Sequence, residues 1–246
     1  MSSSNPLGAP FLELPTVDST NNYAMGMVRA GMAHHGMAVF TMEQTSGKGQ
    51  RDKSWISEPG QNIALTLVIE PQTHFHALFL LSMAIAEGTV RFFRKYVEDD
   101  VSIKWPNDLY WRDRKAGGIL IENVWQGGIW KFAVVGIGIN INQTRFDLLT
   151  PAVSMKQITG KDHNPSALAK ELCVFLDHSY HEAVENPDEL KKAYRNDIYQ
   201  LNEKVKLKKG SRIFEARILN VTDDGKLLVY HGTEEKFDVG EVEWVM

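Results

Sequence analysis

Short apolar runs and helical patterns alternate along the first 200 residues of the chain. Runs rich in Ile, Leu and Val predict strands at residues 11–15, 36–43, 62–70, 101–105, 119–125 and 129–141. Apolar side chains at helical spacing predict helices at residues 20–30, 76–96, 166–183 and 188–197. The last two strands are joined by Gln126-Gly127-Gly128, a strong hairpin signal. The pattern therefore predicts an antiparallel sheet packed against helices.

The pattern changes near Gln200, where longer elements give way to short strands at close spacing. These strands are predicted at residues 204–208, 213–221, 227–230, 236–239 and 242–245. Turn sequences such as Asp223-Asp224-Gly225 separate them. We therefore expect one domain over residues 1–200 and a small β-barrel over residues 201–246.

Residues 44–60 form a polar, glycine-containing segment without helical or strand periodicity. Long loops of this kind inside compact domains are more often functional or mobile than merely connective. Between Gly47 and Trp55 the loop carries Lys48, Arg51 and Lys53, and cations beside exposed backbone amides can hold phosphate. The segment matches neither the Walker nor the dinucleotide pattern, so a solvated loop is the alternative.

Residues 104–122 combine cations, glycines and turn residues. The proline after Trp105 favours an extended conformation at that tryptophan, and Asn107 and Asp108 are typical turn residues. The apolar pattern resumes at Ile119, which predicts a polar bend between strands. Lys115, beside small glycines, makes this bend suitable for an anionic ligand.

Three weaker patterns argue against other chemistries. Gly136-Ile137-Gly138-Ile139-Asn140 resembles the start of a dinucleotide motif but lacks the third glycine; its glycines instead suggest close approach of a ligand or a neighbouring strand. The histidine pairs at residues 34–35 and 74–76 lack the partners of a metal site, so no metal ligands are predicted. The sequence contains no Gly-x-Ser-x-Gly elbow, so this signal of a hydrolase is missing.

Composition limits the partners and the compartment. The formal net charge is -4, from 27 basic and 31 acidic residues, so no global field attracts nucleic acid or an anionic membrane. A single cysteine, Cys173, excludes an intrachain disulfide and is compatible with a reducing compartment. The N-terminus shows no signal sequence, and the apolar stretch at residues 77–86 is shorter than the roughly 20 residues a bilayer needs. We expect a cytoplasmic protein.

Five motifs in series resemble the biotin protein ligases in order and spacing. The motifs are Asp18-Ser19-Thr20-Asn21, Gln44 with Gly47-Lys48-Gly49-Gln50-Arg51, Lys104-Trp105-Pro106-Asn107-Asp108, Lys115-Ala116-Gly117-Gly118-Ile119-Leu120, and Gly136-Ile137-Gly138-Ile139-Asn140. The resemblance covers the chain from Leu14 to the C-terminus, and the lysine-tryptophan-proline motif is its most specific part.

The resemblance implies an α+β fold. A class II synthetase-like catalytic domain, with a central mixed, mostly antiparallel sheet flanked by helices, would precede an SH3-like C-terminal β-barrel. Because the chain begins almost directly at the catalytic domain, it looks like the monofunctional branch of the family, without the N-terminal helix-turn-helix domain. No nucleic-acid or membrane partner is then expected, in agreement with the charge balance.

The resemblance also implies a reaction and its components. A biotin-[acetyl-CoA-carboxylase] ligase uses ATP, accompanied by Mg²⁺, to convert biotin to biotinyl-5′-AMP with release of pyrophosphate. It then transfers biotin to a lysine of a biotin carboxyl carrier protein, or of the equivalent domain of a biotin-dependent carboxylase.

Residue roles follow from the resemblance position by position. Lys115 is expected at the α-phosphate, with Lys48 and Arg51 completing the catalytic set. Expected biotin contacts are Ser19, Thr20, Asn21, Gln44, Gly47, Lys48, Lys115 and Gly118. Expected nucleotide contacts are Gly49, Gln50, Arg51, Trp55, Lys104, Asn107 and Asn140. Asp108 either orients Lys115 or a group on the biotin side, or is only a turn residue.

The chain departs from the family pattern at three positions. Gln50 stands where the family often has a cation, and Asp52 stands where it has glycine, so retention of the intermediate is expected to differ. Ala152 lies near the place where some members carry an aromatic residue that stacks on adenine. The residue that stacks on adenine is therefore left unassigned.

Two other functions stay open. A lipoate-protein ligase shares the fold but binds an apolar dithiolane, and a non-catalytic binding module would keep the fold without the chemistry. Ser19, Thr20 and Gln44 favour biotin over lipoate, and Lys115 favours catalysis over binding alone. We expect a monomer or a homodimer, with an exposed edge strand at residues 129–141 available for pairing with an acceptor or a second subunit.

Overall fold

The computed structural model describes residues 5–51, 53–71, 75, 78–146 and 151–245. Its main feature is a seven-stranded sheet in the order β1-β2-β3-β7-β6-β5-β4, in which β1 and β2 alone are parallel neighbours. The strands are β1 (Phe11–Val17), β2 (Ala38–Gln44), β3 (Asn62–Ile69), β4 (Val101–Lys104), β5 (Asp108–Trp111), β6 (Arg114–Gln126) and β7 (Ile129–Asn140). The predicted α+β class with a mostly antiparallel central sheet is confirmed.

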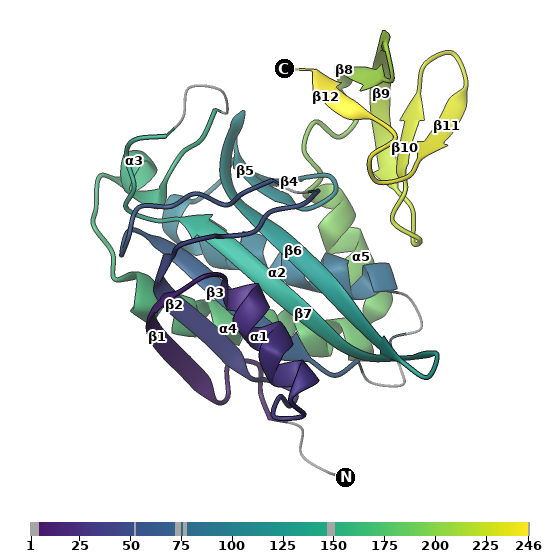
Figure 1. Cartoon of the computed structure of the whole chain (residues 1–246). Coiled ribbons are helices and arrows are strands. Elements are labelled where there is room, and N and C mark those ends of the chain that lie inside the picture. Colours follow the sequence, from purple (N-terminus) through teal and green to yellow (C-terminus); the bar gives the residue numbers. More distant parts are fainter. Residues whose placement is uncertain (1–4, 52, 72–74, 76–77, 147–150, 246) are drawn as a thin grey trace.

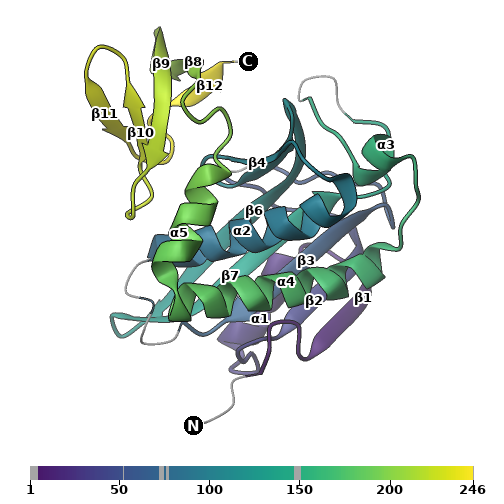
Figure 2. The ribbon, with the colours of Figure 1, turned by 180° about the vertical axis from the view of Figure 1, so that it is seen from behind.

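Helices cover both faces of this sheet. One face carries α1, which lies in front in Figure 1, and the other carries α2, α4 and α5, which lie in front in Figure 2. The helices are α1 (Thr20–Arg29), α2 (Leu78–Val97), α3 (Met155–Thr159), α4 (Pro165–Glu185) and α5 (Pro187–Asn196). Within the described ranges, no helix has the length and apolar character needed to cross a membrane.

Sequence periodicity did not predict α3, because the helix is too short to show a repeat. Local capping explains it instead. Ser154 and Gln157 form a capping box at its start, and Gly160 ends it with a φ of 72°. The longer α4 begins in a similar way, because Asn164 caps the backbone and Pro165 occupies the first turn.

Side chains on β7 alternate between two environments, as the pleat of a strand requires. Val135, Ile137 and Ile139 belong to the large core that also contains residues of α2 and α4. On the opposite face, Val134 packs in a smaller core with Ala24 of α1. Further along this second face, the side chains on β7 shrink to glycine, so the sheet there carries no apolar layer of its own.

A second sheet of five strands follows, in the order β11-β10-β9-β8-β12, with antiparallel pairs throughout. Its strands are β8 (Lys204–Lys209), β9 (Arg212–Val221), β10 (Leu227–Tyr230), β11 (Glu234–Phe237) and β12 (Glu243–Val245). The strand predicted at residues 236–239 is displaced toward the N-terminus, and Val239 is exposed. The division into residues 1–200 and 201–246 stays a prediction.

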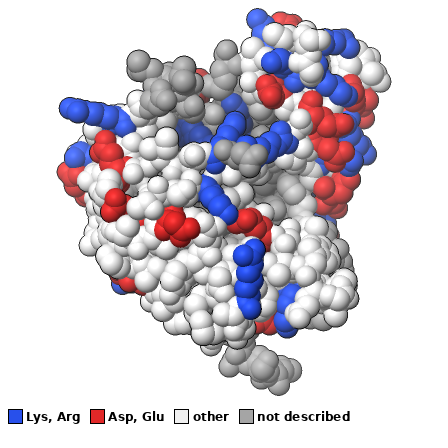
Figure 3. All heavy atoms as spheres, in the orientation of Figure 1, with Lys and Arg blue, Asp and Glu red and all other residues white. Residues whose placement is uncertain are grey.

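The two sheets border a hollow on the face that carries α1. Lys and Arg side chains gather around this hollow, although the chain as a whole is slightly acidic (Figure 3). Positive charge is therefore concentrated locally although the protein as a whole is not basic.

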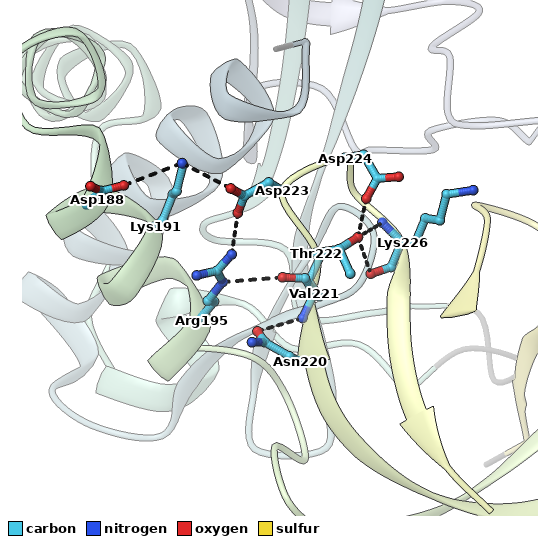
Figure 4. A network of polar contacts seen from close by, with 9 residues as sticks. All are labelled: Asp188, Lys191, Arg195, Asn220, Val221, Thr222, Asp223, Asp224 and Lys226. Atoms are coloured by element: carbon cyan, nitrogen blue, oxygen red, sulfur yellow. Dashed lines mark hydrogen bonds and ion pairs between the residues drawn. The ribbon is translucent and has the colours of Figure 1, made fainter. Parts of the chain in front are cut away.

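An exposed ion-pair network joins α5 to the second sheet (Figure 4). Lys191 Nζ lies 3.2 Å from Asp223 Oδ2, and the Arg195 guanidinium binds the other oxygen of the same carboxylate. Hydrogen bonding from Lys191 is the largest of the effects that lower the pKa of Asp223. Because Asp223 is mostly exposed, this network contributes little to stability.

A buried contact joins the two sheets more firmly. Trp105, which is 3% exposed, donates its indole Nε1–H to the carbonyl oxygen of Gly225 at 2.9 Å. Phe79 of α2 lies directly against Gly225, which has a φ of 89° and no room for a side chain. The tryptophan of the most specific motif thus holds the turn between β9 and β10.

Two sequence predictions are wrong. Residues 104–122 are not one polar bend, because Asp108–Trp111 forms the unpredicted strand β5, and β4, β5 and β6 make a three-stranded meander. Residues 129–141 do not form an edge strand, because β7 is hydrogen-bonded between β3 and β6. The edges are β1 and β4, so pairing with a partner through β7 is excluded.

We expect Trp105→Phe to lower the free energy of unfolding by about 1–2 kcal/mol, because the buried carbonyl of Gly225 loses its donor while the aromatic ring is largely kept. Chemical denaturation measures the change. Trp125→Phe is the control, since Trp125 is 55% exposed and its replacement should change stability by about 0.5 kcal/mol or less. Equal effects of the two substitutions would show that the indole bond to Gly225 is energetically unimportant.

Candidate active site

The glycines of the Gly-Ile-Gly-Ile-Asn motif make room for two side chains. A side chain at Gly136 would overlap with the amide of Asn21, and one at Gly138 would overlap with the indole of Trp55. Gly138 is also paired with Gly118 on the neighbouring β6. Three glycines thus form a floor without side chains of its own, on which Asn21 of α1 and Trp55 of the 44–60 loop lie.

A polar cluster, buried except for the half-buried Gln44, occupies the end of this floor nearest α1. Gln44 Oε1 accepts a hydrogen bond from the backbone N–H of Thr20 at 2.9 Å and lies 3.2 Å from the Thr20 hydroxyl oxygen. Ser19 stands at the N-cap of α1 and is 1% exposed, but its side chain does not cap the helix. The structure therefore brings together Ser19, Thr20, Asn21 and Gln44, the polar residues predicted on the biotin side.

An ion pair lies at the other end of the floor. Lys115 Nζ on β6 is 2.6 Å from Asp108 Oδ1 on β5, and both side chains are about one-quarter exposed, at 26% and 27%. A methyl group on Gly118 would lie 3.2 Å from the Asp108 oxygen and 3.5 Å from the Lys115 nitrogen. The carboxylate thus holds the ammonium beside Gly118, where a ligand can reach it.

The two motif asparagines bind backbone carbonyls near this ion pair. Asn107 donates its side-chain amide to the carbonyl oxygen of Ile119. Asn140 donates to the carbonyl oxygens of Lys115 at 3.3 Å and Val153 at 3.2 Å. Both side chains therefore fix the course of β6 around Lys115, and contact of either with a nucleotide stays a prediction.

The 44–60 loop folds back on itself above the floor. Backbone bonds from Trp55 N to Gly47 O at 2.9 Å and from Gly49 N to Lys53 O at 2.7 Å close it. Lys48 and Arg51 are exposed, and Gln50 is half-buried. The Arg51 guanidinium lies against Gly240 of the second sheet's final loop. Asp52 lies outside the described residues.

Lys104 is sequestered in an aromatic cage. Its ammonium is 3.2 Å from the Tyr110 hydroxyl and lies 4.7, 5.6 and 5.3 Å from the ring centroids of Tyr110, Tyr199 and Trp244. Burial lowers the pKa of Lys104 to about 8; Asp108 opposes this shift and Lys115 adds to it. Because Trp244 belongs to β12, this cage also joins the two sheets, and the predicted nucleotide contact of Lys104 stays untested.

The described histidines and the cysteine that were considered as metal ligands or reactive groups do not take part in this site. His35 Nδ1 accepts from the backbone N–H of Glu70 at 3.2 Å, and burial lowers the pKa of this histidine. The pair at residues 74 and 76 lies outside the described residues. Among the residues that the structure describes, no group of three or more His, Cys, Asp or Glu side chains is placed to hold a metal ion. Cys173 is buried in the core, and burial raises the pKa of its thiol to about 12.

Comparisons with known proteins identify the family of the chain. Residues 13–140 match the model of the biotin/lipoate A/B protein ligase family, and the chain belongs to that family. The matched region contains all five motifs and ends at Asn140. The chain is thus a member of a family of protein ligases.

Individual relatives carry more specific names. The bifunctional ligase/repressor BirA of Escherichia coli is 36% identical over 140 residues, which are 57% of this chain and 43% of that protein. The biotin--[acetyl-CoA-carboxylase] ligase of Paracoccus denitrificans is 34% identical over 52% of this chain and 53% of its own length. The chain thus matches only about half of these relatives.

A solved structure extends the likeness to almost the whole chain. The biotin protein ligase from Aquifex aeolicus, in complex with biotin and ATP, superposes with a TM-score of 0.79 at 24% identity, covering 95% of this chain and 97% of that one. At this identity the likeness establishes the fold, including the small second sheet at the C-terminus.

Sequence reasoning missed several residues around the floor. Thr66 and Glu122 contact the polar cluster, and Tyr110, Tyr199 and Trp244 surround Lys104. Thr66 gave one signal, because it is the single polar residue within the run Ile63–Ile69 of a strand buried at every position. Tyr199 and Trp244 gave none, since they meet Lys104 only through the fold.

Lys104 gives stability a specific pH dependence. Its pKa falls from 10.5 to about 8 on folding, so between these values the unfolded chain binds more protons and stability rises with pH. We expect the unfolding free energy of the wild type, relative to Lys104→Met, to increase from pH 8 to pH 10.5 in denaturation curves. The difference in unfolding free energy between the wild type and Lys131→Met, a substitution at an exposed lysine, should not change over this pH range. Parallel curves for Lys104→Met and wild type would contradict the lowered pKa.

Proposed function

We propose that the protein is an ATP-dependent biotin protein ligase. The observation that carries this proposal is the placement of an amide-and-hydroxyl cluster and an oriented lysine along one strip of glycines. The cluster of Thr20 and Gln44 suits a polar cyclic urea, and Lys115 suits the charge of a phosphoryl group. Family membership and the biotin-ligase names of the relatives support the same assignment.

In the first step, a biotin carboxylate oxygen attacks the α-phosphorus of ATP. A phosphorus–oxygen bond to the carboxylate forms, the bond to the bridging oxygen of the β-phosphate breaks, and pyrophosphate leaves. Negative charge develops on the α-phosphoryl oxygens, and Lys115, held by Asp108, stabilises it without having to reorient. Lys48 and Arg51 hold the phosphates from the loop side.

In the second step, the ε-amine of an acceptor lysine attacks the acyl carbon of biotinyl-5′-AMP. An amide bond forms, the acyl–oxygen bond breaks, AMP leaves and the amine loses a proton. The name of the Paracoccus relative supports a biotin carboxyl carrier protein, or the corresponding carboxylase domain, as the acceptor.

Mg²⁺ bound with ATP would supply charge neutralisation for the departing pyrophosphate. At the Lys115 end of the floor, the carboxylate of Asp108 is engaged by Lys115. This donor set fits a Mg²⁺ ion that is held mainly by phosphate oxygens and water, as is common for nucleotide-bound magnesium.

The polar cluster also bears on the closest alternative, a lipoate-protein ligase. A dithiolane ring offers no N–H or carbonyl group, so it could not form hydrogen bonds with the Thr20 hydroxyl oxygen or with the Gln44 amide nitrogen. A cyclic urea supplies both donors and an acceptor. The geometry therefore favours biotin.

We expect ATP–pyrophosphate exchange to depend on biotin and to fall about 100-fold in Lys115→Ala, because one well-placed charged donor is lost from the transition state. The same assay with lipoate separates the two ligases. Lys131→Ala, at an exposed lysine on β7, is the matched control and should exchange normally. Absence of exchange with either acid would leave a non-catalytic binding module, and undiminished exchange in Lys115→Ala would remove that lysine from the mechanism.

The 44–60 loop has a second expected role. An acyl-adenylate hydrolyses if water reaches it, so closure of the loop over the floor would protect it. Lys48, Arg51 and Lys53 are exposed trypsin sites in this loop. We expect biotin plus ATP to slow cleavage at these bonds at least severalfold, as measured by limited proteolysis and mass spectrometry. Cleavage after exposed Lys161 serves as an internal reference, and equal loop cleavage with and without ligands would refute closure.

A further inference from the structure

A chain of hydrogen bonds extends the polar cluster along the α1 face of the sheet, beside the floor. The Thr66 hydroxyl is 2.8 Å from the Thr20 hydroxyl and 2.7 Å from Asn21 Oδ1, and Asn21 Nδ2 donates to Glu122 Oε2 at 2.8 Å. Thr20 and Asn21 are 3% exposed, and Thr66 is fully buried. Four elements, β2, α1, β3 and β6, therefore meet in one continuous polar chain from Gln44 to Glu122.

Glu122 determines the direction of this chain. A carboxylate accepts hydrogen bonds and does not donate them, so the contact with Asn21 requires the NH₂ group of the Asn21 amide. The other end of that amide, Oδ1, then faces Thr66. Because Gly136 has no side chain, the Asn21 amide can lie directly against the backbone of β7.

The orientation passes from Asn21 to the hydroxyls. Asn21 Oδ1 is only an acceptor, so the one hydroxyl proton of Thr66 is donated to it. The Thr66 oxygen can then accept from Thr20 at 2.8 Å, a shorter contact than the 3.2 Å from Thr20 to Gln44 Oε1. With its proton directed at Thr66, the Thr20 oxygen keeps lone pairs for an N–H donor on a ligand.

Gln44 completes a complementary pair. Its Oε1 accepts the backbone N–H of Thr20, so its Nε2 is left as a donor. The pocket therefore offers an acceptor at Thr20 and a donor at Gln44, the arrangement that matches an N–H and a carbonyl of a cyclic urea. Without Glu122, the Asn21 amide could turn over and the polarity at Thr20 would no longer be defined.

We propose that Glu122 and Thr66 are positioning residues that set the hydrogen-bond polarity of the pocket for the ring of the acid substrate. This inference rests on the proposed function, and it adds a specificity determinant outside the five recognised motifs. The hydrogen-bond chain favours acids whose ring carries N–H donors. It affects the affinity for that ring and not the affinity for ATP.

Steady-state ATP–pyrophosphate exchange with biotin tests the role of Thr66. We expect Thr66→Val, which keeps the shape and removes the hydroxyl, to raise KM for biotin about tenfold, corresponding to about 1.4 kcal/mol. KM for ATP and kcat should stay within about twofold, since one methyl-for-hydroxyl exchange leaves the Lys115 end unchanged. Thr66→Ser should restore KM for biotin, and the biotin-to-lipoate preference should fall only in the valine variant.

Glu122 is tested by its coupling to Thr66. We expect Glu122→Ala to raise KM for biotin in the wild-type background but to add little in the Thr66→Val background, because both act through the same chain. Ser166→Ala is the control for loss of a buried hydroxyl, since Ser166 of α4 donates to Glu13 Oε2 of β1 on the face of the sheet opposite α1.

The outcomes separate the two proposals. No exchange by the wild type would overturn the proposed function and this inference together. With an active wild type, equal KM for biotin in Thr66→Val and Thr66→Ser would overturn the inference alone. So would additive effects of Glu122→Ala and Thr66→Val, or a parallel rise of KM for ATP, because these are the signs of general destabilisation. Denaturation curves confirm that each variant is folded.

Discussion

The pleat of β7 is the constraint on which the rest of the structure depends. Successive side chains of a strand face opposite ways, so this one strand supplies isoleucines to the dry core and glycines to the open floor. Its register with β6 then sets Gly118 opposite Gly138 and fixes the distance to Lys115. A slip of one residue would turn the isoleucines toward the ligand and the glycines toward the core, so stability and chemistry require the same register.

The positive charges of the site are handled in different ways. Lys115 is neutralised by Asp108 but kept partly accessible, whereas Lys104 is enclosed by aromatic rings and its proton is weakly held. The loop cations Lys48 and Arg51 are left to solvent. Positive charge is therefore held in place by a carboxylate at one point and exposed to solvent at another, while the net charge of the chain stays negative.

Local patterns predicted the elements that local interactions determine. The hairpin at Gly127-Gly128, the central helix α2 and the strand β3 all show in the pattern of apolar residues, and the structure contains them. The prediction failed at β5, because four residues flanked by turns are too short for a period to appear. It also failed for the supposed edge strand at residues 129–141, because strand order follows from long-range pairing that periodicity does not encode.

The same limit applies to the candidate site. Its motif residues lie on loops and strand ends, where glycine, proline and charge stand out from an apolar background, so their positions were predicted. The hydrogen-bond partners of these residues were not predicted. Asn21 is separated in sequence from Thr66 by 45 residues and from Glu122 by 101. A lone threonine in a buried strand and a lone glutamate at a strand's solvent end look ordinary until the fold brings them together.

The contact of Arg51 with Gly240 has an evolutionary consequence. These residues are far apart in the chain, yet the guanidinium occupies the space that any side chain at position 240 would need, and the backbone there has a φ of 93°. Because the guanidinium is the end of a long, exposed side chain, it can move aside at little cost, whereas the positive φ disfavours any side chain at position 240. Glycine is therefore expected at position 240 in related chains whatever residue stands at position 51.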